Sequence, residues 1–167
     1  MTPSIGSHKD LEAVVLSSVK QEFSPIARLR KTHPDQYEGG GIPDLEGHIL
    51  GMHVGIELKF GEDRLSPKQL STLIFLQQSQ GLAMLWRYVP ADDTIWVCSR
   101  FQLGIMPSYA RTNFEKVFEC ALPVVSFTVK GVLTRRIQFE PLAELLMRHS
   151  MALGRAQKRV LTALLER

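Results

Sequence analysis

The sequence contains little cysteine, and its two cysteines fit neither a disulfide framework nor a zinc site. Cys98 and Cys120 are the only ones among 167 residues, and they do not form the closely spaced pairs that bind structural zinc. We expect both to be small buried residues in a reducing, intracellular setting.

The sequence also lacks long apolar runs, internal repeats and low-complexity tracts. No run approaches the roughly 20 apolar residues that span a bilayer, and the first residues, MTPSIGSHKD, lack the apolar core of a signal peptide. A hydrophobic fraction of 44% with 22% charged residues is typical of a globular domain. We therefore expect a soluble, cytoplasmic protein that folds as one domain and has no membrane partner.

The net charge is only +3, but it is unevenly distributed along the chain. Residues 1–90 carry 9 basic and 10 acidic side chains, whereas residues 91–167 carry 11 and 7. An acidic cluster beside a basic flank suits an enzyme that holds a metal and binds phosphates. An ordinary solvated surface explains the charge pattern equally well.

The first half of the chain predicts helices and strands in alternation. Ser7 and Asp10 form a capping pattern that opens a helix over residues 8–23, which Pro25 ends. A strand is expected over 26–31, then a polar, glycine-rich loop over 32–41. Two strands over 44–50 and 53–60 are expected to form a hairpin at Gly51.

A second helix is expected to begin with Ser66 as N-cap and Gln69 completing a capping box, and to end at Gly81. Strands over 82–89 and 94–98 follow, and strand–helix–strand order across 53–89 predicts a parallel crossover. Farther on, we expect a helix over 109–121, a hairpin formed by 124–130 and 134–139, and closing helices over 141–149 and 151–166. The expected fold is α/β: a central mixed β-sheet flanked by helices (1–98), with a C-terminal α+β extension (99–167) packed on the same domain.

Glu57 and Lys59 are the first candidates for chemistry. They lie two residues apart on a predicted strand, so both side chains point to one face. Taken alone, the pair is better explained as a surface ion pair than as a functional site.

Asp44 makes a functional site the stronger interpretation. It follows Gly39-Gly40-Gly41-Ile42-Pro43, whose glycines permit close backbone approach to a ligand. In the predicted hairpin Asp44 pairs near residue 58 or 59, which brings its carboxylate close to Glu57. Two neighbouring carboxylates repel unless a cation lies between them, and Mg²⁺ prefers such oxygen ligands.

Glu12 lies near the centre of the apolar stripe of the first helix. An inward-facing carboxylate must be satisfied by a partner, and a metal, a metal-bound water or Lys59 is the expected one. Alternatively, the acid merely stabilises the first helical turn. His33, His48 and His53 have irregular spacing, so a zinc site is not favoured.

The segments GGGIPDL (39–45), GIELK (55–59) and LSPKQ (65–69) resemble the PD-(D/E)xK nuclease superfamily, and most closely the virus-type replication-repair nuclease (VRR-NUC) domain. The resemblance covers about residues 8–89. It implies a restriction-endonuclease-like fold and a metal-dependent endodeoxyribonuclease that uses Mg²⁺, with Mn²⁺ as a substitute. By this resemblance, Asp44, Glu57, the Leu58 carbonyl and Glu12 bind the metal, Lys59 is the catalytic lysine, and Gln69 supports the site. Gln69 also remains explicable as a helix cap.

The expected reaction is hydrolysis of a phosphodiester by metal-activated water, with Lys59 stabilising the developing charge. Stand-alone members of this family resemble Holliday-junction resolvases of phage or prophage origin, which implies branched or junction DNA as substrate and a homodimer. The alternatives are a restriction-like or flap-type nuclease and a non-catalytic DNA-binding protein on a nuclease fold. DNA contacts are expected from seven residues, each of which also suits an ordinary surface position: Arg28, Arg30, Lys31, Gly40, Gly41, Arg64 and Lys68.

Overall fold

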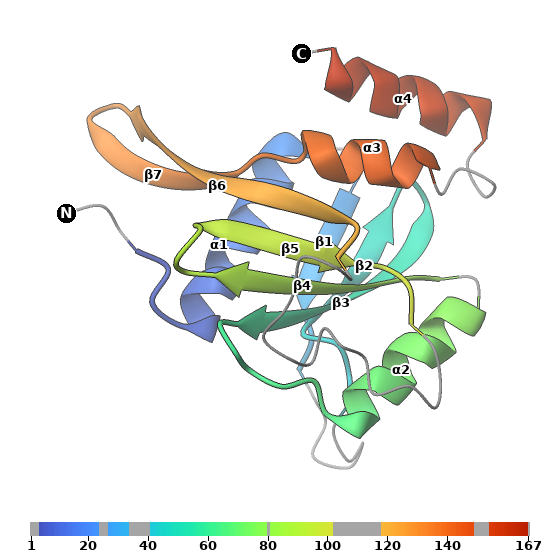
Figure 1. Ribbon diagram of the computed structural model, residues 1–167. Coiled ribbons are helices and arrows are strands. Elements are labelled where there is room, and N and C mark those ends of the chain that lie inside the picture. Colours follow the sequence, from blue (N-terminus) through green and yellow to red (C-terminus); the bar gives the residue numbers. More distant parts are fainter. Residues whose placement is uncertain are drawn as a thin grey trace.

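A mixed, seven-stranded sheet with strand order β1-β2-β3-β4-β5-β6-β7 organises the protein. The computed structural model describes residues 4–23, 27–33, 41–79, 81–101, 118–148 and 154–166. Figure 1 shows the sheet curling between α1, α2 and α3, with the β6–β7 hairpin extending away from the other strands. The expected architecture, a mixed sheet flanked by helices, is confirmed. The elements are α1 (His8–Glu22), β1 (Ala27–Lys31), β2 (Leu45–Ile49), β3 (Met52–Phe60), α2 (Pro67–Gln78), β4 (Leu82–Val89), β5 (Thr94–Cys98), β6 (Cys120–Val129), β7 (Val132–Ile137), α3 (Glu140–Arg148) and α4 (Arg155–Leu165).

Helix α1 begins where the capping pattern predicts. The Ser7 side chain accepts a hydrogen bond from the Asp10 backbone N–H at 3.2 Å, which satisfies one of the free donors at the helix start. One face of α1, which includes Leu11, Val15 and Val19, is fully or almost fully buried against the sheet. The helix is therefore fixed by its apolar face, and its N-terminal turn lies beside the ends of β2 and β3.

Strands β2 and β3 form the predicted antiparallel hairpin. Leu50 and Gly51 link them, both with positive φ (53° and 80°), as a tight two-residue hairpin turn requires. The register pairs Leu45 with Ile56, so the position preceding the strand, Asp44, falls beside Glu57. The predicted pairing of Asp44 with residue 58 or 59 was wrong by one or two positions, because the turn consists of Leu50 and Gly51 and therefore pairs Ile49 with Met52.

Helix α2 connects β3 to β4, and these two strands are parallel, as predicted. Ser66 and Gln69 form the complete capping box, with Pro67 at the helix start. The other neighbouring strands in the sheet pair antiparallel. The crossover places the beginning of α2 over the end of β3 that carries Glu57 and Lys59.

The C-terminal elements share the main hydrophobic core. Residues of α3 such as Leu142 and Leu146 are buried in one cluster with Leu11 of α1 and Ile56 of β3, and Leu161 of α4 belongs to it as well. Strand β6 also continues the sheet from β5. Residues after 98 therefore extend the same sheet and core.

Two expectations for the second half need correction. The helix predicted over 109–121 falls mostly outside the described residues, and its last two positions, Cys120 and Ala121, belong to β6. Cys98 is buried as expected, but Cys120 is only half-buried. In the described part of the chain, no helix combines the length and apolarity needed to cross a membrane.

Candidate active site

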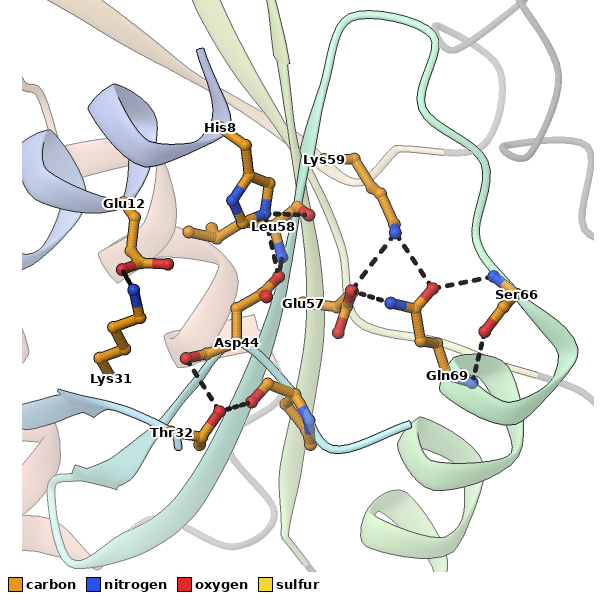
Figure 2. Close-up of polar contacts among 11 residues, drawn as sticks. His8, Glu12, Lys31, Thr32, Asp44, Glu57, Leu58, Lys59, Ser66 and Gln69 are labelled. Atoms are coloured by element: carbon orange, nitrogen blue, oxygen red, sulfur yellow. Dashed lines mark hydrogen bonds and ion pairs between the residues drawn. The ribbon is translucent and has the colours of Figure 1, made fainter. Parts of the chain in front are cut away.

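Asp44 lies immediately before β2, where its carboxylate meets the neighbouring strand. Its Oδ2 accepts a hydrogen bond from the Leu58 backbone N–H at 2.8 Å. The Asp44 carbonyl and the Pro43 carbonyl both accept from the Thr32 hydroxyl, at 3.2 and 2.5 Å. These contacts hold the end of the glycine-rich loop, so that Asp44 projects toward β3 (Figure 2).

Glu57 and Lys59 project from β3 on the face that α2 covers. Their side chains are only 2% and 10% exposed, and Lys59 Nζ lies 3.3 Å from Glu57 Oε1. A surface ion pair is therefore excluded, since both groups are withdrawn from water. Burying such a pair is costly unless further polar groups satisfy it.

Gln69 supplies those further contacts. Its Nε2 donates to Glu57 Oε1 at 2.5 Å, and its Oε1 accepts from Lys59 Nζ at 3.0 Å. The same Oε1 accepts from the Ser66 backbone N–H at 2.9 Å, while the Gln69 N–H donates to Ser66 Oγ. Figure 2 shows this chain of contacts running from the helix start to Glu57. The two interpretations of Gln69, as cap and as support for the site, are thus compatible.

Glu57 has an unusual acidity. Its pKa is raised to about 8, first by burial and then by the neighbouring Asp44 carboxylate, against the opposing effect of the Lys59 ammonium. A group with this environment favours a bound proton or a bound cation over a free negative charge. The site is therefore electrostatically suited to a positively charged ligand.

Glu12 is buried at the inner face of α1, as its place in the apolar stripe predicts. Its Oε1 lies 2.9 Å from Lys31 Nζ, so Lys31 of the edge strand satisfies it. Lys59, which was expected as one partner for Glu12, does not fill that role, because it lies on the face of β3 that α2 covers, where it donates to Gln69. The contact also occupies the Lys31 ammonium, which was expected to bind phosphate.

His8 was not predicted as a site residue, yet it reaches the same place. From the first turn of α1, its Nε2 lies 3.3 Å from Asp44 Oδ2 and 3.2 Å from the Leu58 carbonyl oxygen. The available signal was its spacing of four residues from Glu12, which places both side chains on one helix face. Of the histidines considered for zinc, His48 and His53 contact each other on the β2–β3 hairpin.

The residues at this site fit a divalent cation. Ligand atoms of His8, Glu12 and Asp44 lie within 4.8 Å of one another, and the Leu58 carbonyl faces the same point. Glu57 is not in that cluster of three, but it lies close enough to Asp44 that the Asp44 charge raises the pKa of Glu57. Carboxylate and carbonyl oxygens are the donors that Mg²⁺ and Mn²⁺ accept in proteins.

No family model and no curated protein matches this chain. The assignment of a function therefore rests on the residues themselves and on how the fold brings them together.

The basic residues expected to contact DNA occupy different positions around the site. Arg28 and Arg30 pair with His48 and Glu46 in the β1–β2 register, which places them on the sheet face of Glu57 and Lys59. Arg30 also forms a 2.6 Å ion pair with Glu46. Arg64 and Lys68 are exposed beside the start of α2. Gly41 has φ +94° and packs against Lys68, whereas Gly40 lies outside the described residues.

Arg87 is a second functional candidate that the sequence analysis missed. It is completely buried on β4, beside Lys59 in the parallel register. Its Nη1 donates to the Gly61 and Asp63 carbonyl oxygens at 2.8 and 2.6 Å. Arg87 thereby fixes the loop that joins Lys59 to the capping box of α2. Residues 82–89 were predicted only as a strand, and Arg87 was not considered as a candidate.

Proposed function

We propose that the protein is a metal-dependent endodeoxyribonuclease with a restriction-endonuclease-like fold of the PD-(D/E)xK type. The observation that carries the proposal is the buried network of Glu57, Lys59 and Gln69 beside Asp44. Burying two charges is costly unless further hydrogen bonds satisfy them, and groups with pKa values perturbed by burial and a charged partner cluster at functional sites.

In this function, Asp44, Glu57 and the Leu58 carbonyl hold the cation, with Glu12 nearby. When bound, Mg²⁺ or Mn²⁺ polarises the scissile phosphate and lowers the pKa of a coordinated water. Lys59 donates hydrogen bonds, so it can stabilise negative charge on the attacked phosphate and orient the attacking water. Gln69 keeps Lys59 and Glu57 at a fixed separation throughout.

We propose that the substrate is branched DNA, specifically a four-way junction. A symmetric homodimer would cut it. The resemblance to junction resolvases supports it, and two identical sites related by a two-fold axis would nick two strands. Arg28 and Arg30 of the edge strand lie on the face of the sheet that carries Lys59, where they can contact phosphates to one side of the cut.

The test is cleavage of a labelled panel containing a four-way junction, a flap, a duplex and a single strand, with Mg²⁺ or Mn²⁺. We expect paired symmetric nicks in the junction, and no cutting by the Asp44→Ala, Glu57→Ala or Lys59→Ala proteins. Asp92→Ala and Lys158→Ala are matched controls, since both residues are exposed and lie outside the elements that carry Asp44, Glu57, Lys59 and the basic residues of β1.

Each outcome discriminates between functions. Preference for the flap or the duplex would reassign the substrate while keeping the nuclease. Retained activity in Lys59→Ala would remove that residue from the mechanism. If the wild-type protein binds the junction but cuts no member of the panel with either metal, a DNA-binding role replaces the enzymatic one.

A further inference from the structure

The first turn of α1 brings a nitrogen donor to a site otherwise composed of oxygen atoms. His8 Nε2 lies 3.3 Å from Asp44 Oδ2 and 3.2 Å from the Leu58 carbonyl oxygen, two of the atoms to which the proposed function assigns the cation. His8 is thus placed as a neighbour of the metal rather than as a surface residue.

These separations match the edges of a coordination shell. In an octahedral site with metal–ligand distances of about 2.1 Å, adjacent ligand atoms lie about 3 Å apart and opposite ones about 4.2 Å apart. The two His8 distances correspond to adjacent positions, and the spread of up to 4.8 Å that includes Glu12 requires only a small inward movement.

Hydrogen bonding alone satisfies this arrangement poorly. Nε2 carries at most one proton, yet it faces both a carboxylate oxygen and a carbonyl oxygen. A cation between these three atoms would instead accept a lone pair from each of them: the imidazole nitrogen, the carboxylate oxygen and the carbonyl oxygen. The His8 side chain is 40% exposed, so its ring can turn toward a cation without disturbing the core.

We propose that His8 Nε2 is a direct ligand of the divalent cation, and that it makes the site favour Mn²⁺ over Mg²⁺ and Ca²⁺. Imidazole binds transition metals well, whereas Mg²⁺ and Ca²⁺ prefer oxygen donors throughout. The inference rests on the proposed function for the location of the site, but it concerns metal binding and can be tested without DNA.

The experiment measures Mn²⁺, Mg²⁺ and Ca²⁺ affinities of the full chain by titration calorimetry, for the wild type, His8→Gln and His53→Ala. Gln replaces the nitrogen donor with an amide oxygen of similar reach, and His53 is an exposed histidine on the hairpin that serves as the matched control. Even the removal of a group that only orients a metal ligand lowers metal affinity roughly 10- to 100-fold. We therefore expect at least about a tenfold loss of Mn²⁺ affinity in His8→Gln, a smaller change for Mg²⁺, and no change in His53→Ala.

A spectroscopic readout separates a ligand from a residue that only positions Asp44. Pulsed electron paramagnetic resonance of the Mn²⁺-loaded protein detects ¹⁴N coupling when an imidazole nitrogen is coordinated. The coupling should be present in the wild type and in His53→Ala, and absent in His8→Gln. Its absence from the wild type, or its persistence in His8→Gln, overturns the proposal, and so does an unchanged ratio of Mn²⁺ to Mg²⁺ affinity.

Cleavage of the DNA panel by the same proteins keeps the two proposals distinct. Nitrogen coupling from His8 in a protein that cuts no DNA would leave the metal ligand standing and remove the nuclease function. Metal-dependent cutting by a protein that lacks the coupling would do the opposite.

Discussion

Glu57 determines how the site responds to pH. Its side chain is almost completely buried, and burial raises its pKa to about 8, well above the ordinary value of 4.5. A group whose pKa is raised by folding holds its proton more tightly in the folded state. Its contribution to stability is therefore complete below pH 4.5 and is lost as the pH rises through about 8.

Replacing Glu57 with Gln should accordingly remove a pH-dependent loss of stability. In EDTA, we expect the two proteins to melt at similar temperatures near pH 5, and the wild type to fall below Glu57→Gln by roughly 5–10 °C near pH 9, which corresponds to a few kcal/mol. Melting curves by circular dichroism at several pH values measure this difference. A constant difference between the two proteins from pH 5 to pH 9 would contradict the raised pKa.

The two cysteines should be unreactive in the folded protein. Burial raises the pKa of Cys98 and of Cys120 to about 12, and only the thiolate attacks thiol reagents. At pH 8 we expect less than about one residue in a thousand to be ionised, so reaction with Ellman's reagent should be slow in buffer and rapid in denaturant. If the native protein rapidly released one equivalent of the coloured thiolate from Ellman's reagent, the half-buried Cys120 would be ionised more readily than a pKa of about 12 allows.

At the scale of single elements, the start of α2 links helix stability to the site. Ser66 caps the helix, and Gln69 of the same capping box contacts both Glu57 and Lys59. We expect Ser66→Ala to lose about 1 kcal/mol of stability, because the Gln69 backbone N–H loses its acceptor, Ser66 Oγ. Cleavage should fall several-fold if the first turn of α2 then loosens, although the Ser66 backbone N–H can still donate to the Gln69 side chain. Gln69→Ala should reduce cleavage further.

Ser71→Ala is the matched control for Ser66→Ala. Ser71 is exposed on the same helix, beyond the capping box, so its removal should leave both melting temperature and cleavage rate unchanged. If Ser66→Ala loses stability but keeps full activity, the cap is structural only and Gln69 holds its position without it.

The β1–β2 pair depends on a close backbone approach at Gly47. A Cβ at this position would lie 1.9 Å from the Arg28 carbonyl oxygen, and a backbone atom cannot move away without separating the strands. We expect Gly47→Ala to cost more than about 4 kcal/mol, which is diagnostic of such a clash. Gly6→Ala, where the nearest atom is 3.7 Å away, should be tolerated, and urea unfolding of both variants provides the comparison.

The elements around the site were predictable because each has a local signal. Period-two alternation places Glu57 and Lys59 on one face, and the capping box fixes the start of α2. His8 and Arg87 were missed because their roles depend on what other elements bring near them. A histidine in a first helical turn and an arginine within an apolar strand give no sign in the sequence of which backbone carbonyl they will meet.

At the scale of the whole molecule, residues after 98 complete the core that the first half begins. Leu122 of β6 and Leu142 of α3 are almost fully buried in the same cluster as Leu11 and Leu58. Strand β5 also has β6 as its second neighbour in the sheet. A chain without these elements would expose the inner faces of α1 and the central strands, whose burial contributes about 25 cal/mol for each Å² of apolar surface.

Two truncations should therefore behave differently. We expect residues 1–98 alone to show no cooperative thermal transition, because the apolar surface that α3, β6 and β7 cover would be exposed to water. Residues 1–148 lose α4, which contributes buried Leu161 and packs on α3, so they should still unfold cooperatively at a lower temperature. Calorimetry measures whether each fragment has a cooperative thermal transition, and NMR spectra show whether its amide resonances are dispersed as in a folded protein. A stable, well-dispersed 1–98 fragment would show that the elements carrying Asp44, Glu57 and Lys59 fold as an independent domain, and that the shared core is an addition to it.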